Sequence, residues 1–332
     1  MSAAMTQRAG VLAELPTVLR DLGADVAEVF EQTGIDPNTL CAETRVPFTA
    51  MLSVLERAAR QTGCLHLGLL IGHRFDFALH GPIGQLMLMA PTLGQALTDF
   101  MTWQPGYSSG AIVYLNRFDD VCTFGYGAYA ASHPGSQVLY DAVVAVALKM
   151  VSILTHGTVK PIEVQFSHRA PDDVTVYGRL LKAPMRFDQH RNCIVLDATS
   201  LQVPIPGSDP AMRCRLEEEI ARSVFPKTPD LSARTRHALR HVLFTGAPSL
   251  PAVAAKMNLH PRTLERRLVQ EGQSFRALRD DVRFAVAREL LELTEIPIGE
   301  IAAILAFASP GVFSEAFRRL SGTSPSRWRA KH

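Results

Sequence analysis

The segment SLPAVAAKMNLHPRTLERRL, residues Ser249–Leu268, predicts two short helices joined by a tight turn. Apolar residues recur at helical spacing in its first half, and small alanines there let a second helix approach closely. In its second half Pro261 begins a helix in which Leu264 and Leu268, four positions apart, share one face. The residues off that packing face are Arg262, Thr263, Glu265, Arg266 and Arg267.

The same pattern recurs in IGEIAAILAFASPGVFSEAFRRL, residues Ile298–Leu320. After a turn that is one residue longer, Phe313 and Phe317 take the places of Leu264 and Leu268 at an offset of 49 residues. The six preceding packing positions repeat at an offset of 48 residues, so that Leu250, Val253, Ala254, Ala255, Met257 and Leu259 correspond to Ile298, Ile301, Ala302, Ala303, Leu305 and Phe307. This repeat predicts two helix-turn-helix units in one chain.

The sequence between the two units predicts one long helix. Phe275–Leu293 follows Ser274, a favoured N-cap residue, and its apolar residues fall on one face. Such a helix would hold the second helices of the units, Pro261–Val269 and Pro310–Leu320, at a fixed separation. Helices in this position of a helix-turn-helix read the major groove of DNA, and two of them would span successive grooves about 34 Å apart.

Charge is distributed unevenly along the 332 residues. Residues 231–332 contain 16 Lys and Arg against 9 Asp and Glu, a net charge of +7, whereas residues 1–230 contain 18 against 23, a net charge of −5. A basic last third on a mildly acidic body indicates a polyanionic partner for that third alone.

The cysteines and the hydropathy pattern indicate a cytoplasmic protein. The five cysteines form no CxxC pair, and their odd number favours reduced thiols over a disulfide framework. No uninterrupted run reaches about 18 apolar residues, so no membrane span is expected. The first ten residues lack the apolar core of a signal peptide.

The first half of the body shows helical periodicity. Phe48–Gln61 and Leu93–Trp103 carry apolar stripes with the helical period, and further short helices are expected within residues 11–33 and 65–89. Ser136–Leu154 is strongly apolar and predicts a long buried helix.

Between and after these helices the pattern changes to that of strands. Ala111–Phe118 and Val121–Tyr129, separated by two aspartates, predict a hairpin. Pro161–Ser167 is a further short strand candidate, and Met185–Asp188 and Cys193–Leu196 predict a second hairpin. The expected fold class is therefore an α+β domain with helices around a small, largely antiparallel sheet, followed by an all-α domain.

The body shows no pattern of catalytic or metal-binding residues. GxSxG, Walker A, HExxH and metal-spaced Cys or His clusters are absent from the sequence, so neither catalytic residues nor a cofactor or metal are expected. A small-molecule pocket is expected where the helices cover the sheet. The candidates to line it are His80, Trp103, Tyr107, Tyr126 and Tyr129, although packing in an aromatic core is the more common role for residues at such positions.

A joint of residues 206–230 separates the body from the basic third. Asp209 and Pro210 predict the N-cap and first turn of a helix over Ala211–Val224. Its thin apolar stripe is formed by Met212, Leu216, Ile220 and Val224. This stripe fits either a dimer seam or a surface that docks on the body. The predicted domains are residues 1–205, the effector-binding part, and residues 231–332, the DNA-binding part.

The last third closely resembles the DNA-binding domain of the AraC/XylS family of bacterial transcription regulators. The resemblance covers about 80 residues and rests on Ile301-Ala302, Phe307, Ser309, Phe313, Phe317-Arg318-Arg319, Gly322, Ser324-Pro325 and Trp328-Arg329. The body resembles, more loosely, the arabinose-binding-type effector domain of the same family. That second resemblance rests on Phe166-Ser167-His168 with Pro171, Phe187-Asp188 with Asn192, and Leu201 with Pro204–Pro206. The name of the domain does not make arabinose the ligand.

The resemblance implies a sequence-specific, double-stranded DNA-binding regulator that is controlled by a small-molecule effector. In the first unit we expect Arg262 and Arg266 to contact bases and Thr263 and Arg267 to face phosphates or the groove wall. In the second unit Gly311, Ser314 and Glu315 would face bases, and Arg318 and Arg319 would face the backbone. RNA polymerase and a second copy of the chain are further expected partners. Activation of promoters is expected of the family, although the sequence itself leaves the sign of regulation open.

Two residues depart from the family pattern. Ala306 stands where the family has glycine, and a left-handed backbone there would cost alanine more than glycine. Glu315 stands where relatives place a polar or basic DNA-contacting residue, which predicts weaker base reading by the second unit.

The alternative function is an enzyme fused to this DNA-binding domain. A repair methyltransferase would need a reactive cysteine in a defined setting, and an amidotransferase-like body would need a nucleophile elbow; neither pattern is present. A doubly wound parallel sheet in the body would favour the enzyme, and an antiparallel sheet would favour the regulator. A purely architectural DNA binder would not require so large an apolar body.

Overall fold

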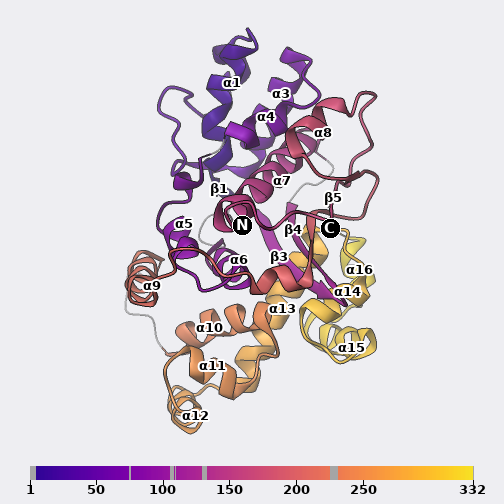
Figure 1. The fold of residues 1–332 in the computed structure, drawn as a ribbon. Helices are drawn as coiled ribbons and strands as arrows, with labels where there is room; N and C mark the ends of the chain where they lie inside the picture. Colours follow the sequence, from indigo (N-terminus) through magenta and orange to yellow (C-terminus); the bar gives the residue numbers. More distant parts are fainter. Residues whose placement is uncertain are drawn as a thin grey trace.

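The computed structural model describes residues 5–74, 76–104, 108, 110–128, 133–224 and 231–331. An α+β domain forms the upper part of the molecule in Figure 1, and a purely helical domain forms the lower part. The two meet along a sheet that lies at the centre. The predicted fold class is confirmed: a small, largely antiparallel sheet with surrounding helices precedes an all-α domain.

Helices form the outer layer of the first domain. They are α1 (Leu15–Asp21), α2 (Val26–Phe30), α3 (Phe48–Thr62), α4 (Leu67–Arg74), α5 (Gly81–Leu88) and α6 (Leu93–Trp103). The predicted α3 and α6 agree with the structure to within one residue. A two-stranded antiparallel sheet of β1 (Thr6–Arg8) and β2 (Arg45–Pro47) precedes α3, and the sequence pattern did not predict it.

The central sheet has five strands. They are β3 (Ala111–Phe118), β4 (Val121–Ala128), β5 (Glu163–Gln165), β6 (Met185–Arg186) and β7 (Asn192–Asp197), in the order β3-β4-β7-β5-β6. The predicted hairpin of β3 and β4 is confirmed. Of the pairs of neighbouring strands, that of β5 with β6 is parallel and the others are antiparallel. The described part of the body therefore lacks the doubly wound parallel sheet that the enzyme alternative requires.

The predicted second hairpin is wrong. Although β6 and β7 are close in sequence, β5 lies between them and pairs with both. Two local features explain this order. Asn192 accepts a hydrogen bond from the amide of Ser167 at 2.8 Å and donates one to its hydroxyl at 3.0 Å, which ties the start of β7 to the residues after β5. Asp188 has a positive φ of 55°, which turns the chain back and leaves β6 at the sheet edge.

Helix α7 (Gly135–Leu154) is the core helix of the first domain. It packs against α3, α4, β4 and β7. Its Asp141, which is buried, accepts a hydrogen bond from the Tyr177 hydroxyl at 2.5 Å and lies 2.9 Å from His168 Nε2. Among the described residues, α7 has the length and mean hydropathy (1.7) of a membrane span, and 50% of that stretch is buried inside the protein. Such burial is typical of the core helix of a folded domain.

The two faces of the central sheet are covered by different domains. Alternate residues of a strand point to opposite faces, and residues paired across strands share a face. Tyr126 is paired with Val113 and Asn192 on the face toward α7. Gly125 is paired with Tyr114 and Cys193, whose side chains point to the other face. Helices α13 (Phe275–Leu293) and α14 (Ile298–Ile304) of the second domain pack against β3 on that other face (Figure 1).

The second domain contains two helix-turn-helix units. Helix α10 (Leu231–Thr245) packs against α11, α12 and α13, and α16 (Pro325–Arg329) packs against α13 and α15. The units themselves are α11 (Leu250–Lys256) with α12 (Pro261–Gln270), and α14 with α15 (Pro310–Ser321). The long helix between them, α13, begins after Ser274, whose hydroxyl accepts from the amide of Ala277 as the sequence predicts. Each second helix begins with a proline and has two buried residues at four-residue spacing: Leu264 and Leu268, and Phe313 and Phe317.

The turns of the two units share one backbone conformation. Asn258 in the first unit and Ala306 in the second, at equivalent positions of the repeat, have positive φ values of 53° and 54°. Asparagine tolerates this left-handed region, whereas alanine is strained there by roughly 1 kcal/mol or more. The second unit keeps the strained turn because Arg283 donates to the carbonyl of Ala306 at 2.9 Å and lies 4.6 Å from the centre of the Phe307 ring.

Replacing Ala306 with glycine should stabilise the protein by about 0.5–1 kcal/mol, because glycine adopts this backbone conformation without steric strain. Ala303→Gly on α14 is the matched control, since Ala303 is an exposed helical residue and should lose about 1 kcal/mol instead. Urea unfolding of both variants measures the difference. If Ala306→Gly destabilised the protein as much as Ala303→Gly does, the turn would not be strained.

Candidate DNA-binding interface and effector cavity

The predicted DNA-reading residues of the first unit lie on the exposed side of α12. Leu264 and Leu268 are fully buried against the rest of the unit. Arg262, Glu265, Arg266 and Arg267 are exposed, and Thr263 is half-buried. Within the described part of the chain none of the three arginines forms an ion pair, so all three guanidinium groups are available to a partner.

The second unit presents a different surface. Phe313 and Phe317 are buried, whereas Gly311, Glu315, Arg318 and Arg319 are exposed and Ser314 is half-buried. Arg319 lies 3.5 Å from Asp280 of α13, and Val312 and Leu320 are exposed apolar residues. The second helix of this unit, α15, thus presents a less basic surface than α12 does. Both second helices nevertheless keep their polar sides free of the first domain.

A half-buried ion pair joins the second unit to the central sheet. Arg191, just before β7, donates through both terminal nitrogens to the two carboxylate oxygens of Glu300 on α14, each at 2.7 Å. Asn116 of β3 lies 3.4 Å from the same carboxylate. The Arg191 and Glu300 side chains are 19% and 27% exposed, so the pair is largely shielded from water. A bidentate, shielded pair of this kind is far more specific in geometry than a surface ion pair.

Two glycines of β4 lie at this interface: Gly127 allows a close approach of the second domain, and Gly125 makes room for the Tyr114 side chain of the neighbouring strand. A Cβ atom on Gly127 would lie 2.3 Å from the carbonyl oxygen of Leu293 at the end of α13, so the backbone of the strand contacts that helix directly. A Cβ atom on Gly125 would lie 2.3 Å from the Tyr114 hydroxyl oxygen and ring. The sequence around these glycines carries no local signal that the second domain packs there.

A second contact between the domains centres on Asp99 of α6. Its buried carboxylate receives hydrogen bonds from Arg213 of α9 (Pro210–Val224) at 2.5 and 2.8 Å, and His241 of α10 lies 3.8 Å away. Burial alone would raise the pKa of Asp99, but the hydrogen bonds from Arg213 and His241 outweigh it and hold that pKa below its ordinary value. The carboxylate is therefore ionised and holds α6, α9 and α10 together.

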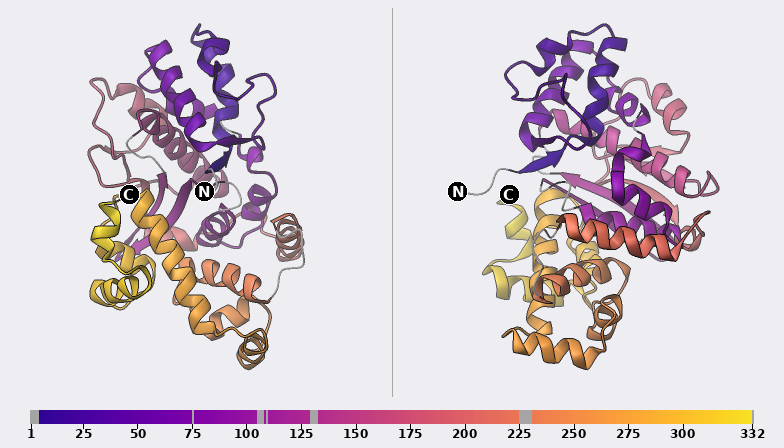
Figure 2. Two further views of the ribbon diagram at one scale, coloured as in Figure 1. Left: turned by 180° about the vertical axis from the view of Figure 1, so that it is seen from behind. Right: turned by 90° about the vertical axis from the view of Figure 1, so that its left-hand side faces the viewer.

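Helix α9 docks on the body. Figure 2 shows it between the purple helices of the first domain and the orange helices of the second. It packs on α5, with Leu216 and Ile220 buried, while Met212 is 43% exposed. Its Glu217 also lies 3.2 Å from Lys256 of the second domain. Of the two uses left open by the sequence, the docking surface is the one present, so these two apolar residues are not available as a dimer seam.

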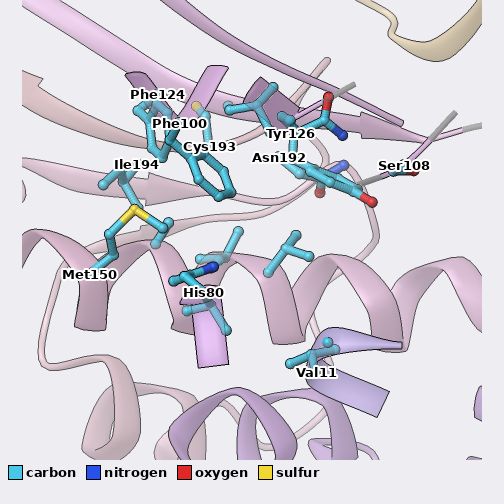
Figure 3. A pocket seen from close by; sticks show the side chains of 18 of the residues that line it. Val11, His80, Phe100, Ser108, Phe124, Tyr126, Met150, Asn192, Cys193 and Ile194 are labelled. Atoms are coloured by element: carbon cyan, nitrogen blue, oxygen red, sulfur yellow. The ribbon is translucent and has the colours of Figure 1, made fainter. Parts of the chain in front are cut away.

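A cavity of about 140 Å³ lies on the face of the central sheet that is turned toward α7, between β4, β7 and α7 (Figure 3). Its walls are formed by apolar side chains from several elements, including Val11, Phe100, Phe124, Met150 and Ile194. Gly125, which carries Tyr114 on its other side, also lines the cavity. The sheet is therefore one backbone layer thick between the cavity and the second domain.

The structure places the predicted effector residues in different surroundings. His80 and Tyr126 line the cavity. Trp103 does not line this cavity: its ring lies against that of His237 of α10, with ring centres 4.3 Å apart and ring planes at 44°, in the contact between the domains. A part for Trp103 in effector binding stays a prediction. Tyr107 and Tyr129 lie outside the described residues.

Several lining residues escaped the sequence analysis. Gln7 of β1 accepts from Ser108 at 3.1 Å and lies 3.5 Å from the Tyr126 hydroxyl, which joins the first strand of the chain to the cavity. Asn192 and Gln104 add side-chain amides. Burial lowers the pKa of His80 to about 4 and raises that of Tyr126, so that both are uncharged at neutral pH. No local pattern in the sequence signals these contacts, because they join residues about 100 positions apart.

Comparisons with known proteins agree with both halves of this structure. Residues 23–205 match the family model described as the arabinose-binding domain of AraC transcription regulators, and residues 253–331 match a helix-turn-helix domain. The transcriptional regulator VirS of Mycobacterium tuberculosis is 24% identical over 317 residues, which cover 94% of this chain and 93% of VirS. The ornithine utilization regulator of Pseudomonas aeruginosa is 24% identical over 320 residues, with the same coverage of 94% and 93%.

A solved structure shows the same overall fold. The crystal structure of the transcriptional regulator CdpR from Pseudomonas aeruginosa covers 96% of this chain and 97% of its own, with a TM-score of 0.50 at 20% identity. The first family model alone spans more than half of the chain, from residue 23 to residue 205. The chain therefore belongs to the AraC family of DNA-binding transcription regulators, in the group that carries the arabinose-binding-type N-terminal domain.

Proposed function

We propose that this regulator is controlled by a small molecule in the cavity, and that the central sheet transmits the signal to the DNA-binding domain. The observation that carries the proposal is that one sheet lines the cavity with one face and holds α13 and α14 with the other. The contact on the second face is fixed by the Arg191–Glu300 pair. We call this pair, together with Asn116, the latch.

The latch lies close enough to the cavity to respond to a ligand bound there. Arg191 is directly followed by Asn192 and Cys193, which line the cavity, and Gly125 lies between the cavity and Tyr114. A ligand that shifts β4 or β7 by a fraction of an ångström moves the guanidinium and the Tyr114 ring with them. A ligand can shift the balance between latched and released domains only by the difference in its affinity for the two arrangements. Because strands of the cavity wall also carry the latch, a ligand would make different contacts with the wall in the latched and released arrangements, and so would bind the two with different affinity.

We further propose how the helices meet DNA. Arg262 and Arg266 contact base edges, Thr263 and Arg267 face phosphates or the groove wall, and Glu265 belongs to the same DNA-facing side of the helix. In the second unit Arg318 and Arg319 bind phosphates, and Gly311, Ser314 and Glu315 lie at the bases. The exposure of these residues and the lack of ion pairs on α12 within the described chain support this assignment.

Other proposals concern partners and organisation. We retain the domain division at 1–205, 206–230 and 231–332, with RNA polymerase and a second copy of the chain as further partners. A second copy would have to use a surface other than the buried side of α9. Family membership supports a non-enzymatic body and a place in the cytoplasm, where chromosomal DNA is accessible to the protein.

Reversing one charge of the latch should release the second domain. Arg191→Glu and Glu300→Arg each leave two like charges in a shielded contact, which should cost about 3 kcal/mol or more. We expect each variant to split thermal unfolding into two transitions. We also expect both to shift in the same direction the affinity for an operator selected from random DNA. The double variant Arg191→Glu/Glu300→Arg should restore both properties.

The pair Arg240–Glu289 provides the control for this experiment. It is also bidentate, with distances of 3.1 and 2.5 Å, but it lies entirely within the second domain. Reversing it should destabilise that domain without separating the two transitions. If the single latch variants kept one transition and unchanged operator affinity, the sheet would not be the route of control.

The two units should respond differently to loss of an arginine. Arg262→Ala should cost about 1–3 kcal/mol of binding free energy and relax the base preference at one position of the operator. Arg318→Ala should weaken binding to all sequences alike and reduce the dependence of affinity on salt, because one phosphate contact is lost. Binding titrations at several salt concentrations, on the operator and on single-base variants, measure both effects. Unchanged operator affinity and base preference in Arg262→Ala, or an unchanged salt slope in Arg318→Ala, would refute the respective role.

A further inference from the structure

The walls of the cavity are predominantly apolar. Along α7, Val143, Val144, Ala147 and Met150 follow the helical period and face the cavity, and Phe124 and Ile194 of the sheet face them from the other side. Figure 3 shows Phe100 beside Phe124 at the sheet and Met150 beside Ile194. These side chains offer contact area to a ligand but no hydrogen bonds.

Most polar groups of the cavity already have partners within the protein. Asn192 uses its amide oxygen and nitrogen on Ser167, and the Gln104 amide donates to the carbonyl of Ala111 at 3.2 Å. Apart from His80 and Arg8, the remaining polar groups gather at one end, where Ser108 and Tyr126 both reach the Gln7 side chain. A ligand can join that chain of hydrogen bonds at one point, through a hydroxyl that replaces or extends it.

The cavity offers little to a charged ligand. Arg8 is the one charged residue among the described lining residues; it is half-buried and already interacts with another group of the protein. His80 is neutral at physiological pH because burial lowers its pKa to about 4. A carboxylate or ammonium group moved into such surroundings would lose its hydration without gaining a counter-charge, which costs several kcal/mol.

The volume limits the ligand to a small molecule. A cavity of roughly 150 Å³ with aliphatic and aromatic walls accepts benzene, and this one measures about 140 Å³. A pentose would also fit by volume, so polarity decides between the two. A pentose brings four or more hydroxyl groups, and each one buried without a partner costs about 1–3 kcal/mol.

We propose that the cavity binds a small uncharged molecule with an apolar body about the size of one aromatic ring and a single hydrogen-bonding group, rather than a sugar or an amino acid. This inference rests on the proposed function, since it names the ligand class of the same cavity. The apolar body lies between α7 and the sheet, against Phe124 and Met150. The polar group points to Gln7, Ser108 and Tyr126.

The test is binding of a small panel to the full-length protein, by calorimetry and thermal shift. Benzyl alcohol and phenol represent the proposed class, benzoate adds a charge to the same body, and L-arabinose and L-ornithine represent sugars and amino acids. We expect benzyl alcohol to bind at least about tenfold more tightly than L-arabinose, since one unpaired hydroxyl is worth that factor. Tighter binding of arabinose, ornithine or benzoate than of benzyl alcohol, or no binding of the two alcohols, overturns the proposal.

A variant whose larger side chain fills the cavity tests whether the ligand binds there. Ala147→Leu places extra methyl groups in the cavity and should abolish the thermal shift by benzyl alcohol while leaving the melting temperature of the unliganded protein at or above that of wild type. Ala27→Leu, at an exposed position of α2, is the matched control and should keep the response. A full response in Ala147→Leu would place the alcohol elsewhere and overturn the assignment.

These experiments can reject the proposed ligand class and the proposed function independently of each other. The latch variants are tested without any ligand, so a normal latch result together with no binding of the alcohols rejects the ligand class alone. Conversely, if benzyl alcohol binds and Ala147→Leu abolishes its binding, but operator affinity is the same with and without it, the ligand class stands. In that case control of DNA binding by this cavity is rejected.

Discussion

The central sheet is buried on both faces, and the rest of the arrangement depends on this. An antiparallel sheet with one solvated face would alternate apolar and polar residues. Here β3 and β4 carry Tyr114, Gly125 and Gly127 on the face away from α7, where a second layer must cover them. The DNA-binding domain supplies that layer through α13 and α14. A domain that completes the core of another cannot move without exposing that core. Under our proposal, a ligand bound in the first domain can therefore affect the position of the second.

The two helix-turn-helix units are related by sequence but differ in their surroundings. The first is attached to the body through Asp99, His241 and α9, and its α12 carries arginines without ion pairs in the described chain. The second contacts the sheet itself through Glu300, and its turn keeps a strained alanine. Because Glu300 lies on α14, within the second unit, a change at Glu300 acts on the second unit first. Our proposal accordingly assigns specific base reading to the first unit and regulation to the second.

Much of the helical architecture could be predicted from the sequence, since it is encoded locally. The repeat at offsets of 48 and 49 residues located both units, and Ser274 marked the start of α13. The strand order could not be predicted, because the Asn192–Ser167 hydrogen bonds that place β5 beside β7 span 25 residues. The same limit applies to the latch, whose partners are 109 residues apart, and to the contact of Gln7 with Ser108 at the cavity. Trp103 was expected near the pocket because it lies where the helices give way to the sheet, whereas in the structure its ring lies against His237 of the other domain.

Hydrogen–deuterium exchange of the wild type and of Glu300→Gln tests the central claim most directly, because it follows both faces of the sheet at once. Loss of the charge on Glu300 should speed exchange in α14 and also in β4 and β7, the strands that line the cavity, while α12 stays unchanged. Such a result would show that the latch and the cavity wall form one cooperative layer. Faster exchange confined to α14, with β4 and β7 as protected as in the wild type, would contradict it.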